Sequence, residues 1–308
     1  MRSQTVTRLR ERHAGVGLHT LCGLFGYTRQ AYYKHVKSNA QHGLEEDIVL
    51  DMVKAYRKEM PRLGGSKLHY LINQSGYKIG RKSLYDLLRN NNLLVRRRKK
   101  YTITTDSKHW MRKWPNLIRG FDFHRPNLLW VSDITYINLQ DGFAYLSLIT
   151  DAYSHKIMGY KLSPTLESEG SISALRMAIE NTPANHRIGL MHHSDRGSQY
   201  CCKEYVKILK GNNIHISMTE NGDPYENALA ERVNGILKSE WLDHEQYVDY
   251  KQANKRICRI IEIYNTLRPH LSCDMLTPEQ AYTEVGKLKK RWKSRKITQK
   301  KIPLPKPV

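Results

Sequence analysis

The pattern of apolar and polar positions divides the 308-residue chain into a helical first third and a strand-rich middle. From Leu18 to Ser38, a short apolar helix, a turn at Gly26 and a second helix from Thr28 follow one another, which is the layout of a helix-turn-helix. Residues 64–94 repeat this layout, with leucines and isoleucines at helical spacing on both sides of the turn YKIG. Plain helical hairpins would give the same two patterns.

The apolar period changes to that of β-strands at about residue 128. Three runs, NLLWVSDITYINL, AYLSLIT and KIMGYKLS, are separated by the turns QDGF and DAYSH, which predicts three antiparallel strands. A helix over about 167–180, a fourth strand (IGLMHHSD), a helix (SQYCCKEYVKILKG), a fifth strand (IHISMT) and a helix entered at Pro224 follow. The order βββαβαβα is that of the ribonuclease-H-like α/β fold, a mixed five-stranded sheet with flanking helices.

These patterns predict five segments along the chain. They are a helix-turn-helix-like DNA-binding segment (1–44), a second helical domain of the same type (45–95), a basic linker (96–120), a ribonuclease-H-like catalytic core (121–285) and a basic tail (286–308). No apolar run approaches the roughly 20 residues that span a bilayer, and no secretory signal is visible, so we expect no membrane partner and a cytoplasmic protein. The five cysteines form no CxxC pair, which favours reduced thiols over disulfides or a zinc site.

Charge is unevenly distributed along the chain. Residues 1–115 hold 24 Lys and Arg against 8 Asp and Glu, residues 116–285 hold 17 against 21, and residues 286–308 hold 10 against none. Two basic arms that flank a mildly acidic middle indicate a protein that binds a polyanion, with nucleic acid favoured over a ribosome-associated or merely solvated surface.

Two clusters in the first basic arm are placed to meet DNA. The second helix of the first pair carries Arg29, Gln30, Tyr33 and Lys34, on the element that enters the major groove in a helix-turn-helix. The linker begins with an unbroken basic run, followed by aromatic residues that suit an arm along a phosphate backbone or a solvated hinge. This run consists of Arg96, Arg97, Arg98, Lys99 and Lys100.

Two aspartates are candidates for metal binding. Asp133 lies in the middle of the first strand, where an unpaired ionised carboxylate is costly unless a cation, a donor cluster or solvent compensates it. The first and fourth strands of the predicted sheet are neighbours, which brings Asp195, at the carboxyl end of the fourth strand, close to Asp133. Two adjacent carboxylates with all-oxygen ligation suit Mg²⁺ or Mn²⁺, although each aspartate alone also fits a hydrogen-bonded structural role.

The helix after the fifth strand offers the third carboxylate. At about 100° per residue, Lys238 lies on nearly the same face as Glu231, two turns along, whereas Glu240 is opposite and Glu226 lies well to the side. An apolar stripe of Leu229, Val233 and Ile236 is expected to face away from Glu231. We therefore expect Glu231 to complete the metal site and Glu240 to have a structural partner.

Three blocks of sequence, WVSDITY, HHSDRGSQY and NALAERVNGILKSE, resemble those of the DDE transposase and retroviral-integrase superfamily. The chain is most similar to the bacterial insertion-sequence family whose type member is insertion sequence three. Thirty-five residues separate Asp195 from Glu231, as in that family, and a basic residue stands seven positions after the glutamate. NGDPYENA, YNTLRPH, TPEQAY and WPNLI…FHRPNLLW match as well, so the resemblance covers roughly residues 45–285.

The resemblance implies a DNA transposase in which Asp133, Asp195 and Glu231 are catalytic and hold two Mg²⁺ (or Mn²⁺) ions. Such an enzyme nicks the terminal inverted repeats of its element and joins the freed 3′-hydroxyl to target DNA, acting as a homo-oligomer, at least a dimer, within the bacterial nucleoid. Lys238 is expected to contact DNA near the scissile phosphate, unless it is simply an exposed helix lysine. Further candidates are the DNA contacts Asn221 and Tyr225, which equally suit a turn and a cap, and the site neighbour His193.

Two other readings of the same residues remain open. A DNA-binding regulator could carry an inactive integrase-like core, and a nuclease of the same fold could only hydrolyse DNA. The family commonly joins a frame like this one to an upstream frame that supplies a helix-turn-helix and a leucine zipper. No heptad run of useful length occurs here, so an upstream-frame partner is one possibility and the Leu18–Ser38 segment is the other.

Overall fold

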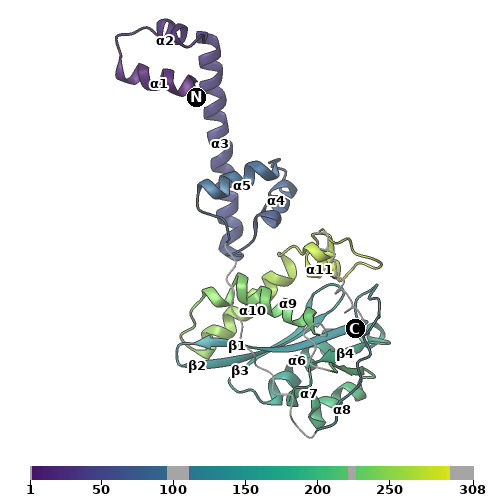
Figure 1. Cartoon of the computed structure of the whole chain (residues 1–308). Helices are drawn as coiled ribbons and strands as arrows, with labels where there is room; N and C mark the ends of the chain where they lie inside the picture. The colour runs from purple at the N-terminus through teal and green to yellow at the C-terminus, as the bar shows by residue number, and fades with distance from the viewer. Residues whose placement is uncertain (1, 96–110, 221–226, 292–308) are drawn as a thin grey trace, which may run out of the picture. The chain divides into compact units, whose positions relative to one another are not determined.

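The computed structural model describes residues 2–95, 111–220 and 227–291, and it divides into two compact units (Figure 1). The N-terminal unit comprises Met1–Glu59 and Gly64–Leu94, and the C-terminal unit comprises Met60–Leu63 and Val95–Val308. Among the described residues, no helix has the length and apolar character needed to cross a membrane.

The first half of the N-terminal unit is a small three-helix bundle. Its elements are α1 (Arg2–Arg12), α2 (Leu18–Leu24) and the start of α3 (Arg29–Glu59). Val6, Leu21, Cys22 and Tyr32 form the buried core that joins them. The turn between α2 and α3 occurs at Gly26, whose φ of 61° lies in the left-handed region that glycine tolerates best. The predicted pair of helices is therefore present, with α1 added beside it.

The second half of this unit is built on the same long helix. α4 (Gly65–Gln74) packs against α3, and α5 (Arg81–Asn90) packs against α4. Their shared apolar residues are all buried, namely Val49, Val53, Leu68, Ile72, Leu84, Leu87 and Leu88. The expected boundary between residues 44 and 45 falls inside α3, which runs without a break for 31 residues. One helix thus belongs to both bundles.

The C-terminal unit is built around a five-stranded mixed sheet. Its strands are β1 (Leu129–Leu139), β2 (Gly142–Asp151), β3 (Ile157–Ser163), β4 (Met191–Ser194) and β5 (His215–Met218). They lie in the order β3-β2-β1-β4-β5; β1 and β2, and β2 and β3, pair antiparallel, whereas β4 pairs parallel with both β1 and β5. This order confirms the ribonuclease-H-like topology and the predicted adjacency of the first and fourth strands.

Helices cover both faces of this sheet (Figure 1). One face carries α6 (Ser168–Glu180), α7 (Ser198–Cys201) and α8 (Lys203–Gly211); the other carries α9 (Ala228–Glu240), and α10 (Tyr250–Thr266) lies along β3. Short segments complete the unit, namely η1 (Ala184–Arg187), η2 (Leu242–His244), η3 (Leu271–Cys273) and α11 (Pro278–Ala281). The single helix expected over 198–211 is in fact two, because Cys202 takes an extended backbone (φ −66°, ψ 149°) between them.

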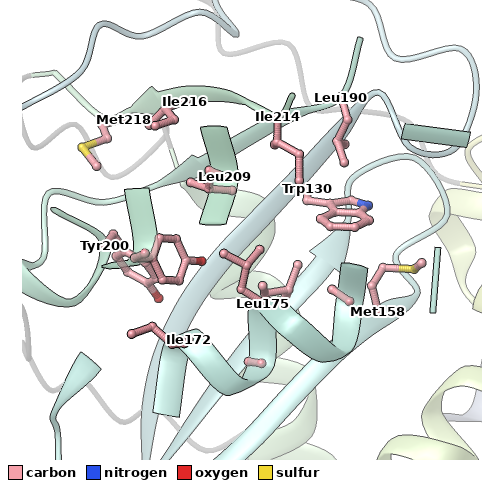
Figure 2. Close-up of a cluster of buried hydrophobic side chains, with 14 of the residues drawn as sticks. Trp130, Met158, Ile172, Leu175, Leu190, Tyr200, Leu209, Ile214, Ile216 and Met218 are labelled. Carbon is pink, nitrogen blue, oxygen red and sulfur yellow. The ribbon is translucent and has the colours of Figure 1, made fainter. Parts of the chain in front are cut away.

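The main core lies between the sheet and the α6–α8 layer. Figure 2 shows Trp130 of β1 beside Leu175 of α6, with Tyr200 of α7 and Leu209 of α8 in the same cluster. Burying an aliphatic or aromatic side chain of this size contributes roughly 1.5–3 kcal/mol, so this layer is the main source of stability for the catalytic sheet. Gly159 of β3 permits the close approach of α6, since a Cβ there would stand 2.1 Å from the Ala174 carbonyl oxygen.

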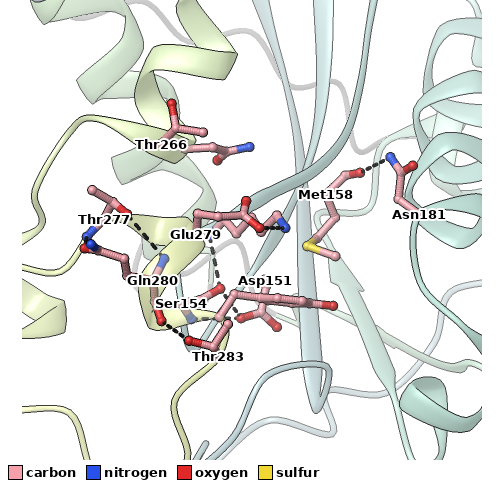
Figure 3. A network of polar contacts seen from close by, with 12 residues as sticks. Asp151, Ser154, Met158, Asn181, Thr266, Thr277, Glu279, Gln280 and Thr283 are labelled. Atoms are coloured by element: carbon pink, nitrogen blue, oxygen red, sulfur yellow. Dashed lines mark hydrogen bonds and ion pairs between the residues drawn. The ribbon is translucent and has the colours of Figure 1, made fainter.

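The motifs TPEQAY and YNTLRPH close the edge and end of the sheet. Asp151, at the end of β2, is buried and accepts hydrogen bonds from the Ser154 backbone and hydroxyl (2.8 and 2.6 Å), while Glu279 of α11 pairs with Lys156 at 2.8 Å (Figure 3). The amide of Asn265 in α10 both accepts from and donates to the backbone of Ile157 at 3.0 Å. The Asn265 side chain thereby pairs with backbone groups of the edge strand β3, as a neighbouring strand would.

Parts of the predicted linker and tail belong to the catalytic unit. Trp114 packs against the main core, and the Leu117 amide donates to the Ser217 hydroxyl of β5 at 2.9 Å. At the other end, the Gly286 amide donates to the His124 carbonyl at 2.7 Å, and the Arg291 amide donates to the Leu271 carbonyl at 2.9 Å. The basic run 96–100 and residues 292–308 lie outside the described residues.

Candidate active site

The two aspartates meet because β1 and β4 are parallel neighbours. The last residue pair in register between these strands is Val131 with His193. Asp133 and Asp195 each stand two residues beyond this pair, so they emerge at the same level and on the same face of the sheet. Neighbouring strands lie about 4.8 Å apart, which places the two carboxylates side by side.

The charges of Asp195 and Glu231 are both part of the electrostatic surroundings of Asp133. Burial, together with the negative charges of Asp195 and Glu231, raises the pKa of Asp133 to about 7, against hydrogen bonds from the Asn234 side chain and the Ile134 amide that lower it. Near neutral pH, this carboxyl group is therefore poised between its neutral and ionised forms, and a nearby cation would favour the ionised form.

Glu231 is held at this site by two contacts that bracket it on α9. Asn234, one turn further on, donates to an Asp133 carboxylate oxygen at 2.7 Å. Asn227, just before the helix, donates to the Ser132 carbonyl at 3.3 Å. Because both contacts reach β1, the first turn of α9 is fixed against the strand that carries Asp133, and Glu231 itself stays exposed.

The apolar stripe expected on α9 was partly wrong. The residues of the helix that are buried are Ala230, Val233, Asn234 and Leu237. Leu229 and Ile236 are only half-buried. The buried face includes a polar residue because the Asn234 amide nitrogen donates to the Asp133 carboxylate, a contact that a pattern of apolar residue types does not reveal.

Asp195 is positioned by the turn that follows it. The Gly197 amide donates to its Oδ1 atom at 3.0 Å, and α7 begins immediately afterwards. Gly197 has a φ of −63°, so left-handed geometry is not the reason for a glycine here. A Cβ at this position would stand 3.0 Å from both Asp195 Oδ1 and Gln199 Oε1, so the glycine instead provides room beside the carboxylate.

The side chains around the carboxylates are mostly buried. His193 is fully buried on the Asp133 face, and its Nδ1 atom lies 2.8 Å from the Ser217 hydroxyl. His192 faces the other side, where its Nε2 atom lies 2.9 Å from the Tyr205 hydroxyl, and burial lowers its pKa to about 3. Tyr200 packs in the main core, and its pKa is raised by burial and then by the charges of Asp195 and Asp133.

Lys238 and Glu240 separate as their helical phase predicts. The Lys238 ammonium stands 3.8 Å from the centre of the Tyr136 ring, at the β1 side of α9. Glu240 pairs instead with the buried Arg268, through oxygen–nitrogen distances of 2.6 and 2.7 Å. The expected structural partner of Glu240 is therefore present, in the motif YNTLRPH.

The other candidate DNA contacts fall in the N-terminal unit or outside the described residues. Arg29, Gln30, Tyr33 and Lys34 belong to the N-terminal unit, and all four are exposed on the first turns of α3. Asn221 and Tyr225, like the run 96–100, lie outside the described residues. Over the described parts of the chain, no three His, Cys, Asp or Glu side chains are already gathered tightly enough to hold a metal ion.

The comparisons with known proteins agree with this topology. Two families, each described as integrase core domain, match residues 124–224 and 212–278. The chain is 33% identical over 264 residues to an uncharacterized 31 kDa protein of insertion element IS600 from Shigella sonnei, with 84% of this chain and 96% of that protein covered. It is 27% identical over 280 residues to transposase InsF of insertion sequence IS3A from Escherichia coli, with coverage of 88% and 96%. The chain belongs to the IS3 family of bacterial insertion-sequence transposases.

A solved structure with a related core is that of the catalytic core domain of HTLV-2 integrase in complex with magnesium. It is 21% identical, has a TM-score of 0.40, and covers 51% of this chain and 97% of its own. The IS3-family transposase described here carries its three candidate carboxylates on β1, after β4 and on α9 of the integrase core.

Proposed function

We propose that this DNA transposase cuts the ends of its element and joins them to target DNA at Asp133, Asp195 and Glu231. The observation that carries the proposal is the shared electrostatic environment of these groups, in which the charges of both other carboxylates raise the pKa of Asp133. Like charges gathered at one edge of a sheet oppose folding unless a ligand of opposite charge compensates them. A divalent cation bound by oxygen ligands is that ligand.

Two Mg²⁺ or Mn²⁺ ions held by these carboxylates would supply Lewis-acid activation of the attacking and leaving oxygens. The residues fit such ions, because the half-buried Asp133 feels the charges of two other carboxylates and accepts a hydrogen bond from the Asn234 side chain. Asn234 donates to one carboxylate oxygen of Asp133 and the Ile134 amide donates to the other, and the two bonds fix the orientation of the group. Asp195 is oriented in the same way by the Gly197 amide.

The reaction has two steps at one site. Water first attacks a phosphodiester at the element end and releases a 3′-hydroxyl, which then attacks a phosphodiester of the target. No covalent bond to the protein is needed, so positioning and charge compensation are the main contributions of these side chains. Lys238, half-buried above the Tyr136 ring, is proposed to contact a phosphate beside the scissile bond.

DNA binding and assembly follow from the same proposal. The exposed residues Arg29, Gln30, Tyr33 and Lys34 suit contact with the terminal inverted repeats, as do the basic run 96–100, Asn221 and Tyr225. Joining two element ends requires at least a dimer on DNA. We also propose the five-segment division of the chain, a cytoplasmic location at the nucleoid and a partner from an upstream frame.

A strand-transfer assay tests the catalytic assignment. Labelled ends, taken from the DNA that flanks the coding sequence, are incubated with the full chain, target DNA and Mg²⁺, and joined products are resolved on a denaturing gel. We expect Asp133→Ala, Asp195→Ala and Glu231→Ala to abolish cutting and joining while the affinity for the ends stays nearly unchanged. Asp141→Ala, in the exposed turn between β1 and β2, is the matched control and should stay active.

Three outcomes of this assay would contradict the proposal. Cutting without joining would identify a hydrolytic nuclease, and binding without either reaction would identify a regulator with an inactive core. Activity that survives Glu231→Ala but is lost in Glu240→Ala would show that the wrong carboxylate of α9 has been assigned.

A further inference from the structure

A mainly apolar stripe lies exposed along the middle of α3, with Lys37 and Asp47 in the same arc of the helix. Tyr33, Val36, Leu44 and Ile48 are 55, 40, 67 and 49% exposed, and Ala40 between them is exposed as well. Their spacings of three, four, four and four residues place all five within about 120° around the helix axis. Four large apolar side chains on one solvent-facing stripe mark an interaction surface more often than chance exposure does.

The stripe belongs to neither of the two bundles in the N-terminal unit. Tyr32, which anchors α3 to α1 and α2, points about 100° away from Tyr33. Val49 and Val53, which face α4 and α5, lie roughly opposite the stripe. The stripe therefore lies on the side of α3 that neither bundle covers.

Charges at the two ends of the stripe indicate what covers it. Arg29 stands eleven residues before Ala40, and Asp51 stands eleven residues after it. Eleven residues bring a helix back to within about 20° of the same direction, so Arg29, Ala40 and Asp51 share the direction of the stripe. The first half of this segment also carries Lys34 and Lys37, and its second half carries four acidic residues, Glu45, Glu46, Asp47 and Asp51.

We propose that the α3 stripe pairs antiparallel with the same stripe of a second copy of this chain, about a two-fold axis at Ala40. This arrangement sets Val36 against Leu44 and Tyr33 against Ile48, with Ala40 facing its own copy where the helices come closest. It also sets each Arg29 against the partner's Asp51. A parallel pair would instead place like charges opposite each other at both ends, which is destabilising.

The spacing of the stripe explains why the sequence shows no heptad run. Repeats of eleven residues keep the contact line on one face of a nearly straight helix, whereas heptads require left-handed supercoiling. The pairing rests on the proposed function, which requires at least a dimer, and it identifies the surface through which two copies associate. In the pair, Arg29 and Tyr33 meet the second copy instead of the terminal repeats. The pairing requires neither the catalytic carboxylates nor DNA, so it and the catalytic assignment can fail independently.

Cysteine cross-linking of the full chain tests the pairing and its direction. In a Cys258→Ser background, which removes an exposed thiol, Tyr33→Cys and Ile48→Cys proteins are oxidised separately and as a mixture, without DNA. We expect a disulfide-linked dimer in the mixture and little in either protein alone. Ser38→Cys, exposed on α3 away from the stripe, is the matched control and should not link to either.

Charge reversal tests the same arrangement by sedimentation equilibrium. Arg29→Asp and Asp51→Arg should each raise the dimer dissociation constant roughly tenfold, because two symmetric ion pairs become repulsive. The double variant should return it close to the wild-type value. Links in the separate proteins would establish parallel pairing, and a monomer without links, or a double variant no tighter than the single ones, would also overturn the proposal.

Discussion

The ion pair between Glu240 and Arg268 gives a stability prediction whose size follows from burial. The Arg268 side chain is 3% exposed and that of Glu240 is 13% exposed, and their two hydrogen bonds measure 2.6 and 2.7 Å. Arg268 also lies 2.7 Å from the Nε2 atom of His270. Glu240→Ala removes the carboxylate and leaves a guanidinium buried without its counter-charge. Breaking one side of such a pair costs about 3–5 kcal/mol.

The cost should nearly vanish when both charges are removed together. Glu240→Leu with Arg268→Met replaces the pair by apolar side chains of similar length, a change that is often neutral or stabilising in a buried site. The comparison of the single and double variants therefore separates the burial of an unpaired charge from the loss of a contact.

Tryptophan fluorescence during urea unfolding measures the stability of the C-terminal unit, which contains this ion pair. All five tryptophans lie between residues 110 and 292, so the signal reports the C-terminal unit alone. With a urea dependence of about 2 kcal/mol per M, Glu240→Ala should lower the unfolding midpoint by about 2 M. A loss below about 1 kcal/mol, or a double variant as unstable as Glu240→Ala, would show that solvent reaches the pair and would refute the reasoning.

Three further changes test the site and its support. In the metal-free protein, Asp133 has a pKa of about 7, whereas the same group in the unfolded chain has a pKa near 4. The protonated group therefore stabilises the folded state below about pH 4, and this contribution to the free energy of unfolding should be lost as pH rises to about 7. The same pH slope in Asp133→Asn would contradict this. Asn234→Ala removes the donor that orients Asp133, so strand transfer should need more Mg²⁺ for half-maximal rate, and an unchanged Mg²⁺ dependence would count against that role. Gly159→Ala places a methyl group 2.1 Å from a carbonyl oxygen of α6, and thermal unfolding should show a loss of at least about 2 kcal/mol; wild-type stability would mean that the helix can move aside.

Much of the catalytic unit could be predicted from the sequence because its signals are local or depend on topology alone. The strand runs and turns predict the order of elements, and that order makes β1 and β4 neighbours, which brings Asp133 and Asp195 together. Helical phase separates Glu240 from Glu231, and the structure confirms a partner for Glu240 in Arg268. Roles for the three carboxylates in catalysis stay a prediction.

What the sequence did not reveal depends on contacts between distant segments. α1 was missed because RSQTVTRLRER has few apolar residues, and only Val6 of these is fully buried. The buried face of α9 was misjudged because Asn234 is buried through its bond to Asp133, 101 residues away. The break at Cys202 and the packing of Trp114 on the core are likewise decided by tertiary structure.

The unbroken α3 fixes the distance between the two N-terminal bundles. Its 31 residues, at about 1.5 Å each, extend for roughly 46 Å. B-DNA rises about 3.4 Å per base pair, so a duplex that lies along this helix and touches both bundles has its two contacts about 13 base pairs apart. Base pairs inserted between these contacts cannot be absorbed by bending a linker, because the spacer is itself a helix that both bundles pack against. The distance between two such contacts is thus set by the middle of α3, the part of the helix that lies between the two bundles.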